Sequence, residues 1–95
     1  MNATDSANTK DFQMTKIYAA DGFRPVEAET MTEAANIFAD RLARRKYGKN
    51  AVSHTNQNSW ASDGTMGEYQ AFVGRYDRQS RSSTGDNVWI TVYVK

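Results

Sequence analysis

Apolar and polar residues alternate most regularly near the C-terminus. Between Asn87 and Lys95, one set of alternate positions is apolar and branched: Val88, Ile90, Val92 and Val94. The positions between them hold Trp89, Thr91 and Tyr93. Successive side chains of a strand point to opposite faces of its sheet. The pattern therefore predicts a strand over Asn87–Lys95 with one aliphatic face and one aromatic face.

A β-hairpin is predicted near the start of the chain. Two strand-like runs, Phe12–Ala19 and Phe23–Glu29, flank Asp21-Gly22, and Asp-Gly between two such runs is the strongest short-range hairpin signal. Pro25 cannot donate a backbone hydrogen bond to a sheet ladder, so we expect the second strand at a sheet edge or at a bulge.

After the predicted hairpin, the apolar residues are spaced as on an α-helix. Thr30 and Glu33 have the spacing of a capping box, with Thr30 as N-cap and the Glu33 side chain reaching back to it. At about 100° per residue, a set of apolar side chains shares one face: Met31, Ala34, Ala35, Phe38 and Leu42. Gly48 suits the left-handed position just past a helix end. We predict one amphipathic helix over Met31–Tyr47.

The chain between this helix and the last strand is less regular. Ala51–Ala61 is polar and predicts at most a weak strand, and Asp63-Gly64 indicates a turn. Gly67–Tyr76 predicts a strand with mixed faces, whereas Ser80–Gly85 has the composition of a loop.

The order ββαβββ predicts an α+β fold, with an antiparallel sheet of four to five strands and one amphipathic helix packed on one face. Residues 1–10 are small and polar without periodicity, so we expect a disordered leader there and a single domain over 11–95.

Composition argues against catalysis. A 95-residue chain fits one domain and buries only roughly 60–65% of its unfolded surface, too little for a deep substrate cavity. The absence of cysteine excludes disulfide scaffolds, thiolate zinc sites and cysteine nucleophiles. His54 lies in no nucleophile or metal-ligand signature, and no glycine pattern resembles a phosphate-binding loop. We expect no enzymatic activity, cofactor, metal, small-molecule substrate or membrane association.

Charge is nearly balanced but unevenly distributed. With 12 Lys+Arg against 11 Asp+Glu, the chain is neither an overall DNA mimic nor a polycation. Five cations without an intervening acid lie at the C-terminal end of the predicted helix: Arg41, Arg44, Arg45, Lys46 and Lys49. Arginine donates paired hydrogen bonds to phosphate or carboxylate. Cations also stabilise a helix C-terminus through the helix dipole, and Asp40 can pair with Arg44, so both interpretations stay open.

Arginines also gather around the predicted loop, at Arg75, Arg78 and Arg81. A loop of this kind can fold around a phosphate backbone or an acidic protein surface. An ordinary solvated loop fits equally well, because Asp77 and Asp86 partly neutralise it.

Trp89 and Tyr93 share the face of the last strand that the helix is not expected to cover. Large uncovered aromatics often mark a contact surface and supply its binding energy. The alternative is that Ala51–Met66, with its own Trp60, folds back over them.

The run Phe23–Arg45, FRPVEAETMTEAANIFADRLARR, resembles a pattern in small phage proteins. In them an edge strand ending in Glu-Ala-Glu-(Ser/Thr) leads directly into an alanine-rich helix. Among these proteins are anti-CRISPR proteins that inhibit type I-F CRISPR–Cas systems. The resemblance implies a monomeric, non-catalytic protein that binds Cas proteins of a type I surveillance complex in the cytoplasm of an infected bacterium and blocks target DNA.

The dispersed acids favour steric insertion over DNA mimicry, with cations contacting acidic Cas surfaces or guide-RNA phosphates. The expected contact residues are Arg41, Arg44, Arg45, Lys46, Lys49, Arg75, Arg78, Arg81, Trp89 and Tyr93.

A small helix-on-sheet module that binds RNA or DNA is the alternative function. Double-stranded-RNA-binding domains are similar in this layout and in their basic helix end. This chain departs from them because Val-Tyr-Val-Lys stands where their second helix would follow.

Overall fold

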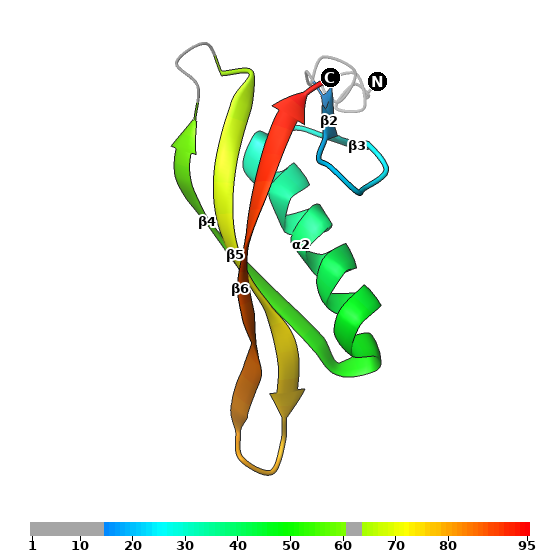
Figure 1. Ribbon diagram of the computed structural model, residues 1–95. Coiled ribbons are helices and arrows are strands. Elements are labelled where there is room, and N and C mark those ends of the chain that lie inside the picture. The colour runs from blue at the N-terminus through cyan, green and yellow to red at the C-terminus, as the bar shows by residue number, and fades with distance from the viewer. Residues whose placement is uncertain (1–14, 61–63) are drawn as a thin grey trace, which may run out of the picture.

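The computed structural model describes residues 15–60 and 64–95, without the side chains of 57–60. Its elements in chain order are β2 (Lys16–Ala19), β3 (Val26–Ala28), α2 (Met31–Tyr47), the short 3-10 helix η1 (Gly48–Asn50), β4 (Ala51–Trp60), β5 (Met66–Asp77) and β6 (Ser82–Val94). The strands form one sheet in the order β3-β2-β6-β5-β4, and neighbours are antiparallel (Figure 1). The predicted α+β fold is confirmed. The predicted leader, residues 1–10, lies outside the described residues.

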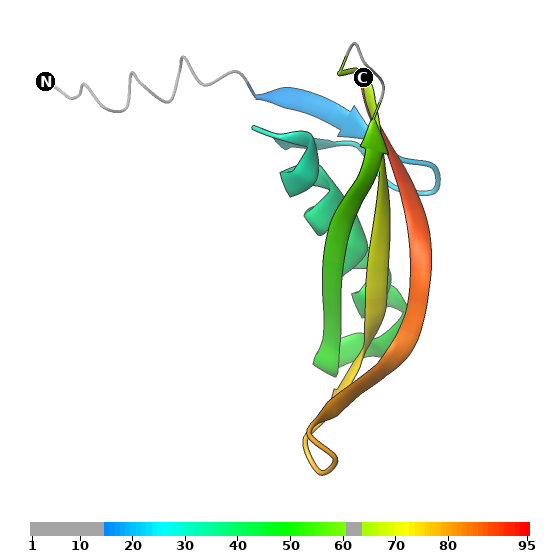
Figure 2. The same cartoon turned by 90° about the vertical axis from the view of Figure 1, so that its left-hand side faces the viewer.

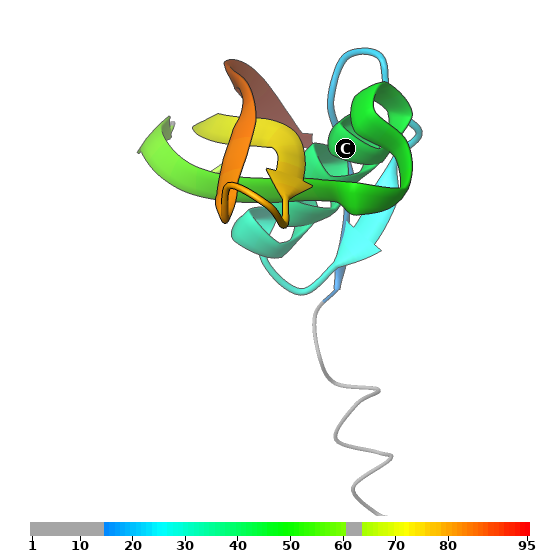
Figure 3. The ribbon, with the colours of Figure 1, turned by 90° about the horizontal axis from the view of Figure 1, so that it is seen from below.

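The helix packs on one face of the curled sheet, as Figures 2 and 3 show from two further directions. The core between these layers contains Phe38 from the helix and Tyr69 and Val92 from the sheet, all fully buried. The hydroxyl oxygens of Tyr69 and Thr32 lie 3.1 Å apart and share a hydrogen bond. The largest buried side chain therefore has a polar partner, which removes the penalty of an unsatisfied buried hydroxyl.

The helix begins and ends at the predicted residues. The Thr30 hydroxyl accepts a hydrogen bond from the Glu33 N–H at 3.1 Å. The Glu33 carboxylate accepts from the N–H of Glu29 at 2.9 Å, one residue before the predicted partner Thr30. Gly48 ends the helix with a φ of 75°, and its N–H donates to the Arg44 carbonyl.

The buried face of the helix differs from the prediction at its edges, and Met31 and Leu42 are only half-buried. Ala34, Ala35 and Phe38 are fully buried as expected, and Ala39 and Ala43 are buried with them. Small side chains allow the helix to lie close to the sheet, so positions beside the predicted stripe also lose contact with water.

The first hairpin is confirmed where it is described, with a second strand that begins at Val26 instead of Phe23. Residues 12–14 of the predicted first strand lie outside the described residues. Tyr18 pairs with Val26 across β2 and β3, and Gly22 in the turn has a φ of 85°. As Pro25 predicted, β3 is an edge strand of the sheet.

The polar segment after the helix forms more than a weak strand. Ala51–Trp60 is a ten-residue edge strand that pairs with β5, with one irregularity between Gln57 and Ser59. Backbone hydrogen bonds to β5 stabilise it without an alternating apolar pattern.

The prediction of a loop over Ser80–Gly85 is right for its first two residues, which lie in a turn, and wrong for the rest. The last four residues, Ser82–Gly85, belong to β6 and pair with β5 from Asp77 to Gly74. Gly74 and Gly85 face each other, and a Cβ added at Gly85 would collide with the Val73 carbonyl. Here glycine permits the close approach of two strands, whereas composition alone suggested a break. The turn itself spans only residues 78–81.

In the described ranges, no helix is both long and apolar enough to cross a bilayer.

Candidate partner-binding surface

The cations that close the helix are all exposed, but they differ in their partners. Arg44 Nε lies 2.9 Å from Asp40 Oδ2, and Lys46 Nζ lies 3.6 Å from Asp86 Oδ2. The Tyr47 hydroxyl also donates to Asp86, at 3.2 Å. Two of the predicted contact residues are therefore engaged in structural ion pairs.

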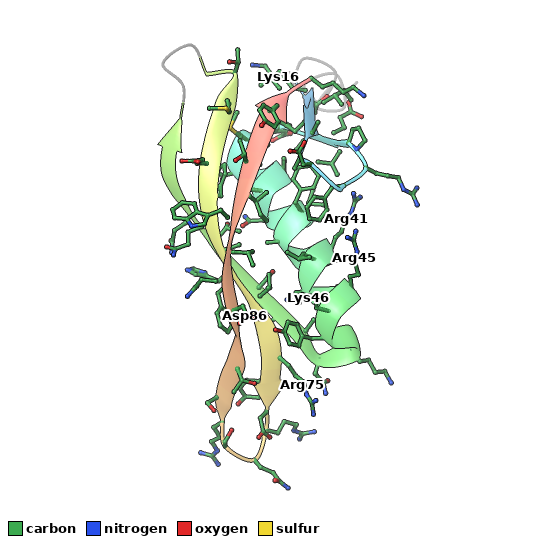
Figure 4. The ribbon with its side chains drawn as sticks, in the orientation of Figure 1. Lys16, Arg41, Arg45, Lys46, Arg75 and Asp86 are labelled. Atoms are coloured by element: carbon green, nitrogen blue, oxygen red, sulfur yellow. The ribbon has the colours of Figure 1, made fainter. Side chains whose placement is uncertain are left out.

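Arg41 and Arg45 have different surroundings. Arg41 Nη1 donates to the Arg24 carbonyl at 3.3 Å, and the Arg45 guanidinium lies 5.4 Å from the centre of the Phe23 ring. Within residues 15–60 and 64–95, no carboxylate forms an ion pair with either arginine. Figure 4 shows both on the same side of α2, next to the β2–β3 turn. Their charges remain available to an anionic partner.

Arg24 joins these two arginines, although its isolated position in the sequence did not indicate a role. A cavity of about 510 Å³ is lined by Gly22, Phe23, Arg24, Pro25, Arg41 and Arg45. We call Arg24, Arg41 and Arg45 the helix–turn cluster. The position of Arg24 could have been predicted from the topology. β3 leads directly into α2, and α2 runs in the opposite direction to β3. A residue just before β3 then lies beside the second half of the helix.

Arg75 and Arg78 form a second basic group, here called the hairpin cluster. They line a cavity of about 520 Å³ with Asn50, Tyr76, Asp77, Gln79 and Thr84. Arg81 lies in the adjacent turn with a φ of 56° and does not line this cavity. Lys49 is exposed at the end of the helix and lines neither cavity.

The aromatic face of β6 is uncovered. Trp89 is 58% exposed and Tyr93 is 39% exposed. The alternative, cover of these aromatics by Ala51–Met66, is wrong for the described part of that segment, because β4 continues the sheet beyond β5 instead of folding over β6.

A third cavity connects this face to the helix–turn cluster. It has a volume of about 320 Å³ and lies between the β2–β3 turn, α2 and β6, with the lining Ala20, Asp21, Gly22, Phe23, Leu42, Arg45, Trp89, Ile90, Thr91 and Tyr93. Arg45 lines both this cavity and that of the helix–turn cluster. The structure thus brings Arg45, Trp89 and Tyr93 together, which their sequence positions did not indicate.

Metal-ligating side chains do not gather in the described parts of the chain. His54 is exposed on β4, and no group of three or more His, Cys, Asp or Glu side chains there could hold a metal ion. Burial raises the pKa of Tyr18 above its usual 10.0, with smaller contributions from Tyr69 and Glu33. Tyr18 belongs to the core and lines none of the three cavities.

Exposed guanidinium and aromatic groups thus make up this surface. Comparison of the chain with protein-family models, curated proteins and solved structures finds no match.

Proposed function

We propose that this protein is a non-catalytic, monomeric inhibitor that binds a type I CRISPR–Cas surveillance complex in the cytoplasm of an infected bacterium. Its helix–turn cluster contacts acidic Cas surfaces or guide-RNA phosphates, and the bound protein blocks target DNA sterically. The observation that carries the proposal is the gathering of Arg24, Arg41 and Arg45 around one cavity without a carboxylate partner in the described residues.

Arginine at these positions favours an anionic macromolecule. An exposed guanidinium without an ion pair keeps donors for bidentate hydrogen bonds to carboxylate or phosphate. Arg41 uses one of its five N–H donors on the Arg24 carbonyl and retains the others. Three such groups on one side of a chain with formal net charge +1 give a directional positive surface. The overall charge adds little non-specific attraction.

The choice of a CRISPR complex rests on the resemblance in Phe23–Arg45. That run contains Arg24, Arg41 and Arg45 together with the edge strand and the capped helix that position them. The segment that resembles anti-CRISPR proteins is thus also the segment that builds the candidate surface.

Binding to a purified, guide-loaded type I-F complex tests this proposal. We expect co-elution with the complex and competition with target DNA. Replacing Arg24, Arg41 and Arg45 together by alanine should weaken binding by at least tenfold. The matched control replaces Arg44, Lys46 and Lys49 by alanine, which removes the same charge outside the cluster. The proposal fails if no complex forms, or if both triple variants bind equally.

Direct nucleic-acid binding is the second candidate function. The observation favouring it is a second basic group: Arg75 and Arg78 line one cavity, and Arg75 lies near the end of α2 (Figure 4). It predicts that the isolated protein shifts RNA or DNA in a gel at low salt and loses this binding steeply as salt rises. Absence of a shift with single-stranded RNA, double-stranded RNA and double-stranded DNA would exclude it.

A further inference from the structure

β6 has a strand neighbour along its whole length on one side only. On that side, β5 pairs with it from Met66↔Tyr93 to Asp77↔Ser82. On the other side, β2 pairs only at Tyr18↔Val94 and Ala19↔Tyr93. The chain then turns away, and the Phe23 N–H donates to the Ala20 carbonyl at 3.1 Å. No strand in the described part of the chain lies beside Asn87–Thr91 on this side.

The backbone groups that face this free edge follow from two hydrogen bonds at the end of β6. The Val94 N–H donates to Thr65 on the β5 side at 2.9 Å, and the Lys95 N–H donates to Ile17 on the β2 side at 2.8 Å. Because alternate residues of a strand direct their N–H and C=O groups to opposite sides, the odd-numbered residues face β2. Asn87, Trp89 and Thr91 therefore present their backbone donors and acceptors along the edge that β2 leaves uncovered.

The cavity of about 320 Å³ adjoins this edge. Phe23, Leu42 and Ile90 give it apolar walls, and Trp89, Thr91 and Tyr93 line it from β6 itself. This volume is at the lower end of the range of ligand pockets. A strand added in line with β2 would direct alternate side chains towards the helix, where the cavity can receive one large apolar side chain.

The positive charge around the site favours an acidic partner among extended segments. Arg45 lines the cavity, and Arg24 and Arg41 line the neighbouring cavity that shares Gly22, Phe23 and Arg45 with it. Asp21 is the acid in the wall, so arginines outnumber acids around the site. A second copy pairing β6 with β6 would bring two helix–turn clusters to one seam, which like-charge repulsion disfavours.

We propose that the free edge of β6 at Asn87–Thr91 and the adjoining cavity bind an extended acidic segment of a partner protein by strand addition. The backbone of Asn87, Trp89 and Thr91 supplies the ladder, the cavity takes an aromatic or aliphatic side chain, and the helix–turn cluster pairs with flanking carboxylates. This interaction goes beyond the proposed function, because it requires neither a CRISPR complex nor a nucleic acid.

Fluorescence anisotropy with a labelled heptapeptide, DEVFVED, tests the proposal on the full chain. We expect saturable binding, at least tenfold weaker binding of the basic peptide KKVFVKK, and NMR shifts centred on the amides of Asn87, Trp89 and Thr91. An acidic peptide that does not bind, or that binds no better than the basic one, would overturn the proposal.

Backbone methylation of the peptide distinguishes strand addition from simple charge attraction. A docked strand uses only one of its two edges, so N-methylation of one set of alternate residues should abolish binding and N-methylation of the other set should preserve it. This comparison leaves the protein unchanged and so does not depend on the folding of a variant. Equal binding of the two methylated peptides would contradict the proposal.

Two charge-reversal variants of the protein, one inside and one outside the cavity, test which residue the peptide contacts. R45E should weaken peptide binding by at least tenfold, whereas R44E, which changes a residue paired with Asp40 outside the cavity, should leave it within twofold. Equal loss in both variants would contradict the assigned site. Sedimentation of the free protein tests whether a second copy occupies the edge. If the protein is a dimer and W89P abolishes that dimer, the edge binds a second copy and the proposal is wrong.

Discussion

The Arg45 guanidinium lies 5.4 Å from the centre of the Phe23 ring, so a helix side chain packs over the β2–β3 turn. The Phe23 ring in turn lies 5.1 Å from the ring of Phe38, tilted by 47°. Since Phe38 is fully buried, this aromatic pair fixes the turn to the core. The helix–turn cluster is therefore held by packing as well as by the backbone.

Replacing Phe23 by alanine should lower the free energy of unfolding by about 1–2 kcal/mol, because the half-buried ring loses its contact with Phe38. Urea denaturation measures the change. Arg45→Ala is the control, and it should change stability by under about 1 kcal/mol because a partly exposed cation–π contact is weak. A larger effect of Arg45→Ala than of Phe23→Ala would contradict this role of the ring.

Ala39→Leu should destabilise the protein by about 1–3 kcal/mol, because the helix has no space for extra methyl and methylene groups where it lies close to the sheet. Thermal and urea unfolding measure the effect. Arg44→Leu places a similar side chain on the exposed face of the same helix and should change stability by only about 0.5 kcal/mol. If the Ala39→Leu variant is as stable as the original protein, the helix does not pack as closely as described.

Thr30→Ala should lower stability by about 1 kcal/mol, because the Glu33 N–H loses its side-chain acceptor. Thr30→Ser retains the hydroxyl and should recover most of this loss. Circular dichroism during urea unfolding gives both values. Equal stability of the alanine and serine variants would show that the hydroxyl does not cap the helix.

Gly85→Ala should destabilise the β5–β6 hairpin, since the added methyl group collides with the Val73 carbonyl. The expected loss is about 1–3 kcal/mol, as for other overpacking changes. Ser83→Ala, at an exposed position of the same strand, is the control and should have little effect. Hydrogen exchange of the paired amides locates the change, and unchanged protection would disprove the predicted close approach.

Stability should fall at alkaline pH through Tyr18. Burial raises its pKa above 10.0 in the folded protein, so the folded state holds the phenolic proton more tightly than the unfolded state. Its contribution is complete below pH 10.0 and is lost as the pH rises through the raised value. In urea titrations from about pH 8 to 11, Tyr18→Phe should lose less stability than the original protein. Parallel loss in the two proteins would contradict this assignment.

The helix and the first hairpin were predictable because their signals are local. Met31–Tyr47 has a capping hydroxyl, an apolar stripe and a terminal glycine, and each reflects a constraint within a few residues. The Asp21-Gly22 turn is equally local. The interior face of β6 followed from strict alternation of its side chains.

The errors have a different origin, because they concern contacts between distant segments. Ser82–Gly85 has the composition of a loop, but its backbone pairs with β5, and this pairing overrides composition. The importance of Arg24 depends on where the strand before the helix lies. The choice between an uncovered Trp89 and one covered by Ala51–Met66 was left open by the sequence, because it depends on the strand order. Of the predicted cation set, the structure separates Arg44 and Lys46, which have acidic partners, from Arg41 and Arg45, which have none in the described ranges.

Asp86 marks the place where the β5–β6 hairpin leaves the body of the protein. Its carboxylate binds Lys46 and Tyr47 at the end of the helix, whereas residues 75–84 beyond it are all exposed and project past α2 (Figure 1). This distal arm has a backbone ladder but no core, and the glycine pair at its base offers no side chains to stiffen it. Its opening should need less free energy than opening of the part of the β5–β6 ladder that covers the core. We therefore expect local opening of the arm to displace Arg75 and Arg78 while the helix and the core stay in place.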